Sequence, residues 1–123
     1  MTAPITCHLE KGFVRAIEGG YEADHLRDYM ESFNDPEVYA VSHIGWGMQD
    51  RAHWSVMGFY DREASIGMDS RACSGNFLWS TGPNNEAGGT RDTACHIDIP
   101  MRGCTVTLDD VPVVKDGRLV ENT

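Results

Sequence analysis

The chain has 123 residues, of which 41% are hydrophobic and 24% charged, and its formal net charge is −9, which is typical of one soluble globular domain spanning residues 1–123. The acidic balance and the scattered lysines and arginines argue against nucleic acid or an anionic membrane surface as a partner, since both require a basic face. No apolar run approaches the roughly 18 residues of a membrane-spanning helix. The first residues, MTAPITCHLEKG, lack the pattern of a signal peptide, so we expect a cytoplasmic protein.

The N-terminal third predicts a hairpin followed by a helix. Residues 5–18 indicate two short strands joined by a turn at Lys11-Gly12. After a glycine pair, the segment 21–33 carries apolar side chains at the i, i+3, i+4, i+7 spacing of a buried helical stripe. Asn34-Asp35-Pro36 is expected to end this helix. The predicted stripe consists of Leu26, Tyr29, Met30 and Phe33.

The rest of the chain predicts mainly strands. We expect strands in EVYAVSHIGWG (37–47), GNFLWSTG (75–82), ACHIDIP (94–100) and CTVTLDD (104–110), and a terminal hairpin about Asp116-Gly117. A short helix is expected near residues 61–65. The predicted fold class is therefore α+β, with a mostly antiparallel sheet and one main helix.

The four cysteines, Cys7, Cys73, Cys95 and Cys104, are even in number and could form two disulfides. None of them lies in a CxxC pair, and a cytoplasmic protein keeps its thiols reduced, so we expect free cysteines. On a strand, Cys95 would face away from its neighbour His96, and we do not count it as a metal ligand.

The segment ACHIDIP raises a question of chemistry, because it places two polar side chains inside an apolar run. His96 and Asp98 are two residues apart, so on a strand they project to the same face. A carboxylate on a buried face costs several kcal/mol unless a cation or a hydrogen-bond donor compensates it. Two such ligands from one strand, with a third from elsewhere, would form the two-histidine, one-carboxylate set of non-haem iron proteins.

The third ligand is expected to be another histidine near a strand end. His43 is the strongest candidate, because it lies near the end of a predicted strand and glycines follow it. His53 is the second candidate, and His8 is the third. The spacing alone leaves an ordinary interpretation open, in which His96 is hydrogen-bonded to a neighbour and Asp98 lies in a surface turn.

Several blocks of sequence resemble the C-terminal part of the 2,5-dihydroxypyridine 5,6-dioxygenases, which are distantly similar to thermophilic aminopeptidases. The blocks are SHIGWGMQDRAHW, YDREASIGMDSRACSGNFLWSTGPNNEAGGTRDTACHIDIPMRGCTVTLDD and VVKDGRLV, and the resemblance extends over about residues 12–120. It implies an Fe(II) centre at strand ends, held by His43, His96 and Asp98, with Zn, Mn or Cu as other metals that this set could accept. Family members are expected to be longer, so the chain would be either a truncated form or a small protein that keeps the metal-binding part.

The resemblance implies an enzyme, an oxidoreductase that cleaves a dihydroxylated aromatic ring such as 2,5-dihydroxypyridine with dioxygen. The loop before the HxD segment carries Glu86, Arg91 and Asp92, which we expect to hydrogen-bond a ligand or receive the substrate. Trp46 and Tyr60 are expected to line the substrate pocket.

Two other functions stay open. The same ligands could hold Zn²⁺ and activate water in a hydrolase of the aminopeptidase or esterase type. The chain could also be a non-catalytic metal-binding dimer. A face that the longer relatives would cover favours self-association, so we expect a homo-oligomer.

Overall fold

The structure, a computed structural model, describes residues 3–59 and 67–121. The chain forms two compact units, the first made of Met1–His43 and Ser80–Ile97 and the second of Ile44–Trp79 and Asp98–Thr123. The expected short helix near 61–65 and the side chain of Tyr60 fall outside the described residues. That residues 1–123 form one domain stays a prediction.

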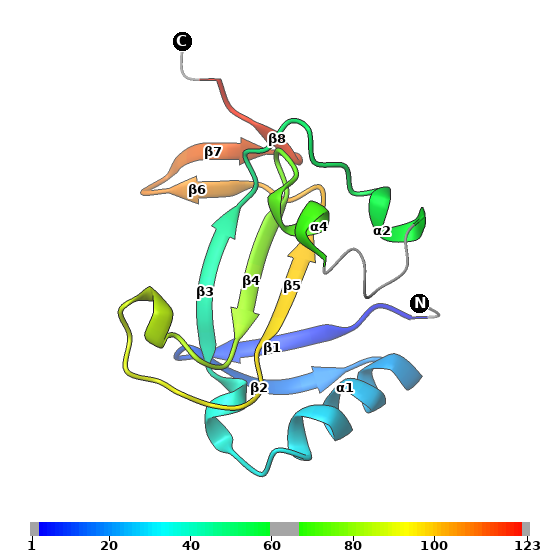
Figure 1. Cartoon of the computed structure of the whole chain (residues 1–123), viewed down its shortest axis with the longest axis vertical. Coiled ribbons are helices and arrows are strands. Elements are labelled where there is room, and N and C mark those ends of the chain that lie inside the picture. The colour runs from blue at the N-terminus through cyan, green and yellow to red at the C-terminus, as the bar shows by residue number, and fades with distance from the viewer. Residues whose placement is uncertain (1–2, 60–66, 122–123) are drawn as a thin grey trace. The chain divides into compact units, whose positions relative to one another are not determined.

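Strands dominate the described part of the chain, and α1 is its main helix, which confirms the predicted α+β class. The strands form three sheets, in the orders β1-β2, β3-β4-β5 and β6-β7-β8. The elements, with η for a 3₁₀ helix, are β1 (Thr6–Glu10), β2 (Phe13–Glu18), α1 (Tyr21–Glu31), η1 (Pro36–Tyr39), β3 (Val41–Trp46), α2 (Val56–Phe59), α4 (Met68–Ala72), β4 (Phe77–Thr81), η2 (Asn85–Ala87), β5 (Ile97–Met101), β6 (Val106–Leu108), β7 (Val111–Lys115) and β8 (Arg118–Leu119) (Figure 1).

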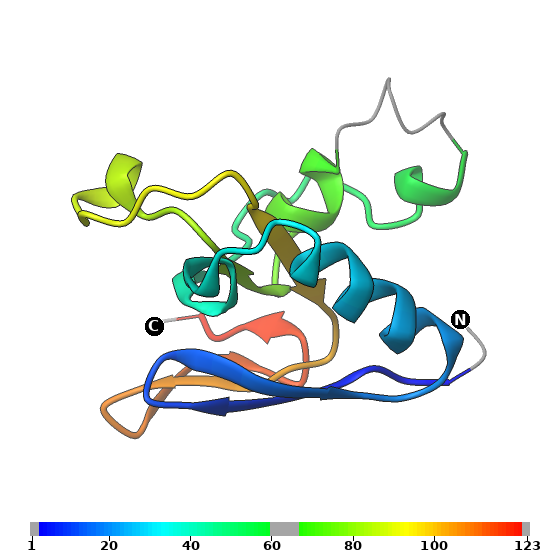
Figure 2. The same cartoon turned by 90° about the horizontal axis from the view of Figure 1, so that it is seen from below.

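The first unit begins with the predicted hairpin. Lys11 and Gly12 have φ angles of 52° and 78° and connect Glu10 to Phe13, as in a two-residue turn with positive φ at both positions. Helix α1 lies along this hairpin (Figure 2) and contacts β2, where Arg27 Nη1 donates to the Ile17 carbonyl at 2.5 Å. The turn therefore follows from local chemistry, and the helix is held to the hairpin by this contact.

The buried face of α1 differs from the predicted stripe. Ala23 and Met30 are buried, whereas Tyr29 is 50% exposed and packs edge-on against Phe33 with ring centroids 5.2 Å apart. The prediction was wrong for Tyr29 because the small side chain of Ala23 sets the line of closest approach, and Met30, seven residues later, lies on that line.

The predicted strand over residues 37–47 begins later than expected. Residues Pro36–Tyr39 form η1, and β3 starts at Val41. The Asp35 carboxylate accepts a hydrogen bond from the Glu37 backbone N–H at 3.0 Å, and Pro36 has the φ angle that the first turn of a helix needs. This cap outweighs the alternating pattern of the segment. Helices α2 and α4 were not predicted, because four or five residues are too few to show a helical period.

In the second unit, β6, β7 and β8 form an antiparallel meander. Each connection has positive φ at both turn residues, at Asp109-Asp110 (47° and 66°) and at Asp116-Gly117 (49° and 76°). The second of these is the predicted terminal hairpin. Val114 of β7 is fully buried and Trp79 of β4 is 8% exposed, so these two side chains contribute to the core of the unit.

All four cysteines are free, as expected. Burial raises the pKa of the Cys95 thiol, so Cys95 stays protonated. Within the described ranges, no helix has both the length and the apolar character needed to cross a bilayer.

Candidate metal centre

His43 lies in β3, and both its backbone N–H and its backbone carbonyl are hydrogen-bonded to the hydroxyl of Ser80. The His43 N–H donates to Ser80 Oγ at 3.3 Å, and Ser80 Oγ lies 3.4 Å from the His43 carbonyl oxygen, to which it donates. Ser80 is fully buried in β4. Because the buried hydroxyl bonds both backbone groups of His43, it fixes the backbone from which the His43 side chain extends.

His96 lies one residue before β5 and is brought toward His43 by a close backbone contact. Gly82, with a φ of +100°, lies so near the Cys95 carbonyl that a Cβ atom there would be 1.9 Å from the oxygen. The Gly82 N–H also donates to the Ala40 carbonyl at 2.9 Å. The residues before β3, after β4 and before β5 thus meet at one point. The rings of His43 and His96 lie close to this point, with centroids 5.5 Å apart and planes inclined by 40°.

Asp98 follows His96 by two residues on β5. One ligand atom from each of His43, His96 and Asp98 lies within 4.8 Å of the other two. Two ligands that each lie about 2.1 Å from one cation can be at most about 4.2 Å apart, so a shift of some tenths of an ångström would satisfy a common ion. Two imidazoles and one carboxylate fit a divalent transition metal. The structure therefore brings together the three residues of the predicted metal set.

Sequence reasoning missed one charged partner of this set. Arg71 of α4 donates from Nη1 to Asp98 Oδ2 at 2.7 Å, and the two side chains are 29% and 18% exposed. The segment MDSRACSG around Arg71 lies within one of the blocks of resemblance, but its spacing gave no reason to single out this arginine.

A cavity of about 360 Å³ adjoins the two imidazoles in the first unit. It is bordered by η2 and by the loop on either side of it. The lining side chains that carry polar groups are Ser42, His43, Asn84, Asn85, Glu86, Asp92 and His96. Two of the three loop residues expected near the metal, Glu86 and Asp92, therefore line the cavity of His43 and His96.

Asn84 organises this loop. Its side-chain Oδ1 accepts from the Arg91 N–H at 2.9 Å, and its carbonyl accepts from the Gly89 N–H at 2.9 Å. These bonds close the loop between residues 84 and 91 and fix the direction in which Asp92 leaves it. Asn84 was not predicted, since an asparagine in a polar loop has no distinctive spacing.

Arg91 is engaged elsewhere in the first unit. Its Nε donates to Glu37 Oε2 at 2.5 Å, and its guanidinium lies 5.8 Å from the centroid of the Phe13 ring. Arg91 does not line the cavity of His43 and His96. Its expected role near the metal stays a prediction, as does that of Trp46, which is half-buried in β3.

The two weaker histidine candidates do not belong to the three-residue set. His8 Nε2 is 3.0 Å from Glu18 Oε2 across the β1-β2 hairpin. His53 is exposed and lines a different cavity, of about 660 Å³, in the second unit. Within the part of the chain that the structure describes, no other group of three potential ligands converges as closely.

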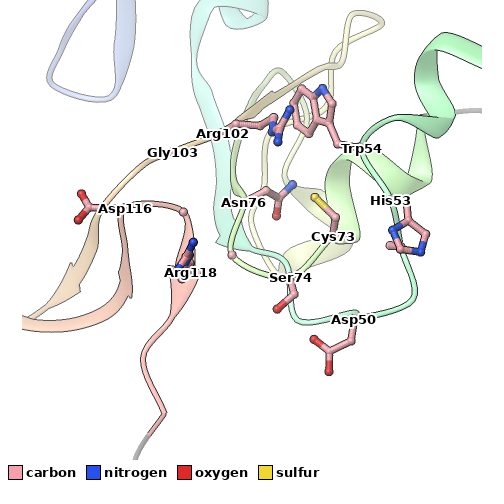
Figure 3. A pocket seen from close by; sticks show the side chains of 13 residues that line it. Asp50, His53, Trp54, Cys73, Ser74, Asn76, Arg102, Gly103, Asp116 and Arg118 are labelled. Atoms are coloured by element: carbon pink, nitrogen blue, oxygen red, sulfur yellow. The ribbon is translucent and has the colours of Figure 1, made fainter.

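Figure 3 shows this second cavity, in which Arg102 lies over Trp54 with 5.5 Å from the guanidinium carbon to the ring centroid. Arg102 and Arg118 face the cavity together with Asp50 and Asp116. Two positive and two negative groups balance each other, so this lining does not select a ligand of one charge.

Comparisons with known proteins point in one direction. The profile of a family described as NicX, 2,5-dihydroxypyridine 5,6-dioxygenase, matches residues 1–121. A curated 2,5-dihydroxypyridine 5,6-dioxygenase from Pseudomonas putida KT2440 is 60% identical over 116 residues, which are 94% of this chain and 33% of that protein. A solved structure of 2,5-dihydroxypyridine dioxygenase from the same strain superposes with a TM-score of 0.95 at 56% identity, covering 99% of this chain and 35% of that one. The chain thus spans about a third of the length of these relatives.

Proposed function

The chain belongs to the 2,5-dihydroxypyridine 5,6-dioxygenase family, and from this membership we propose that it forms the metal-binding part of an Fe(II)-dependent, ring-cleaving dioxygenase. The proposed substrates are dioxygen and a dihydroxylated aromatic or heteroaromatic ring such as 2,5-dihydroxypyridine. The observation that carries the proposal is the convergence of His43, His96 and Asp98, whose ligand atoms lie within 4.8 Å of one another.

The three residues would hold the metal, His43 and His96 through imidazole nitrogens and Asp98 through a carboxylate oxygen. Fe(II), when bound, would supply the redox chemistry by which a dihydroxylated ring reacts with dioxygen. With three protein ligands, the metal could also bind groups that the protein does not supply. The donor set also accepts Zn, Mn or Cu, so the choice of Fe(II) rests on the family.

The cavity beside the imidazoles is proposed to receive the ring. Its volume of about 360 Å³ is within the range of small-molecule sites. Glu86 and Asp92 are proposed to orient the ring and to accept the proton of a ring hydroxyl at a carboxylate oxygen. Arg91, which is bound to Glu37, is proposed to act on the site by holding the loop that ends at Asp92.

The test combines metal content with oxygen uptake on the purified chain. We expect the unaltered chain to retain Fe(II) and to consume oxygen when 2,5-dihydroxypyridine is added. His96→Ala should lose both properties, because one of three ligands is gone. The matched control is His25→Ala, which removes an exposed histidine on α1.

Each outcome bears on a different part of the proposal. Unchanged metal content in His96→Ala would place the metal elsewhere and overturn the site. Metal binding without oxygen uptake, together with Zn²⁺-supported hydrolysis of a peptide or ester under anaerobic conditions, would replace the dioxygenase with a hydrolase. Metal binding with neither activity would favour the non-catalytic protein.

A further inference from the structure

We infer that Arg71 is a positioning residue for Asp98, fixing the orientation of the carboxylate that holds the metal. This inference rests on the proposed metal centre and concerns a residue that the spacing of the sequence does not single out. Arg71 Nη1 donates to Asp98 Oδ2 at 2.7 Å. A charge-assisted bond of this length is stronger than a neutral hydrogen bond.

Partial burial strengthens the ion pair of Arg71 and Asp98. The side chains of Arg71 and Asp98 are 29% and 18% exposed, so water and salt screen their attraction less than at an open surface. An exposed ion pair contributes little, whereas a partly buried pair with a short, direct contact keeps its geometry. The carboxylate of Asp98 is therefore restrained in its rotation before any cation arrives.

Arg71 is itself held by the backbone of α4. Its carbonyl accepts from Asn76 Nδ2 at 3.0 Å, and the same amide group also donates to the Ser70 carbonyl. Asn76 is 3% exposed, and its Oδ1 accepts from the Gly47 N–H at 2.7 Å. A buried amide with three bonds anchors the end of the helix, so the guanidinium reaches Asp98 from a fixed base.

A consequence for the metal follows from the geometry of a carboxylate. When a guanidinium engages one oxygen, rotation of the carboxylate is restrained, and the other oxygen is favoured as the single contact to the cation. Hydrogen-bond partners of this kind behind a ligand commonly change metal affinity by about 10- to 100-fold when they are removed. The alternative role makes the opposite prediction. If the guanidinium only occupied the place of the cation, its removal would tighten metal binding.

The experiment titrates Co²⁺ alone into the purified chain and follows its visible absorption. Arg71→Gln removes the charge, and we expect its affinity for Co²⁺ to fall about 10- to 100-fold. Arg71→Lys, which keeps one charged donor, should recover part of this loss and shift the Co²⁺ absorption bands relative to the unaltered chain. The matched control is Arg27→Gln, which removes another arginine paired with an aspartate, Asp24, on α1, and should leave the affinity unchanged.

Equal or tighter Co²⁺ binding by Arg71→Gln overturns the inference. If Arg71→Gln does not fold, as circular dichroism would show, Arg71→Lys decides the matter, and an affinity and spectrum equal to those of the unaltered chain overturn it. His96→Ala separates the two proposals. When it abolishes binding while Arg71→Gln binds normally, the metal centre stands and only the role of Arg71 falls. An unaltered chain that binds no Co²⁺ removes both.

Discussion

The imidazole rings of His43 and His96 lie 5.5 Å apart between centroids, although α2, α4, β4 and η2 all lie between the two residues along the chain. Their approach depends on backbone rather than on side chains. Gly82 touches the Cys95 carbonyl directly ahead of His96 and donates to the carbonyl of Ala40, three residues before His43. The proposed metal site is therefore expected to be sensitive to a residue that carries no functional group.

Gly82→Ala is expected to disrupt this meeting point. A Cβ atom would lie 1.9 Å from the Cys95 oxygen, and the φ of +100° disfavours any L side chain. We expect the free energy of unfolding to fall by about 3 kcal/mol, measured by urea denaturation, and Co²⁺ affinity to fall with it.

Gly88→Ala provides the matched control for that change. Gly88 has a similar φ of +90°, but a Cβ atom there meets nothing within 4 Å. Only the strain of a positive φ then acts on the substituted residue. We expect the free energy of unfolding to fall by about 1 kcal/mol, with unchanged Co²⁺ affinity. Equal effects of the two substitutions would contradict the importance of the contact with Cys95.

Metal binding is expected to weaken as the pH falls. Each imidazole must release its proton before a ring nitrogen can bind the cation, so protons compete with the metal at His43 and His96. Titrations of Co²⁺ at a series of decreasing pH values should show a declining affinity. An affinity that does not change over this range would exclude histidine ligands.

The cap of η1 predicts a second pH dependence, this time of stability. The hydroxyl of Thr93 donates to Asp35 Oδ2 at 2.6 Å, and this bond and the Glu37 N–H lower the pKa of the Asp35 carboxyl from its ordinary value of 3.8. A lowered pKa in the folded state means that the ionised group stabilises the fold above pH 3.8, and that this contribution disappears as the pH falls through the lowered pKa.

Asp35→Asn should therefore be less stable than the unaltered chain near neutral pH, and the gap should close in acid. Urea denaturation at a series of pH values measures the gap directly. Thr93→Val removes the bond with the largest effect on the pKa and should produce part of the same gap. A difference in unfolding free energy that is constant with pH would show that the charge of Asp35 contributes nothing.

Local chemistry explains which parts of the fold could be predicted. The turns at Lys11-Gly12 and Asp116-Gly117 need positive φ angles, which their residue types tolerate, and both hairpins form there. His96 and Asp98 could be paired because a strand repeats every two residues. The start of β3 could not be predicted from the sequence, because the cap at Asp35 competes with the alternating pattern and forms a 3₁₀ helix instead.

Long-range contacts explain the rest. Spacing alone left His43, His53 and His8 as candidates for the third ligand, and the backbone contacts of Gly82 with Cys95 and Ala40 help to bring the first of them to His96. Arg71 reaches Asp98 from a helix of five residues that has no readable period. Neither contact can be predicted from the neighbouring residues in the sequence.

Glu86→Gln separates orientation of the substrate from binding of the metal. Glu86 lines the cavity beside His43 and His96 but does not belong to the converging set, so its loss should leave Co²⁺ affinity unchanged. Oxygen uptake with 2,5-dihydroxypyridine should fall by about 100-fold if the carboxylate accepts the ring proton. Glu10→Gln, an exposed change in the β1-β2 hairpin, serves as the control. Uptake by Glu86→Gln that equals the control would exclude Glu86 as the proton acceptor and leave Asp92 as the carboxylate to test.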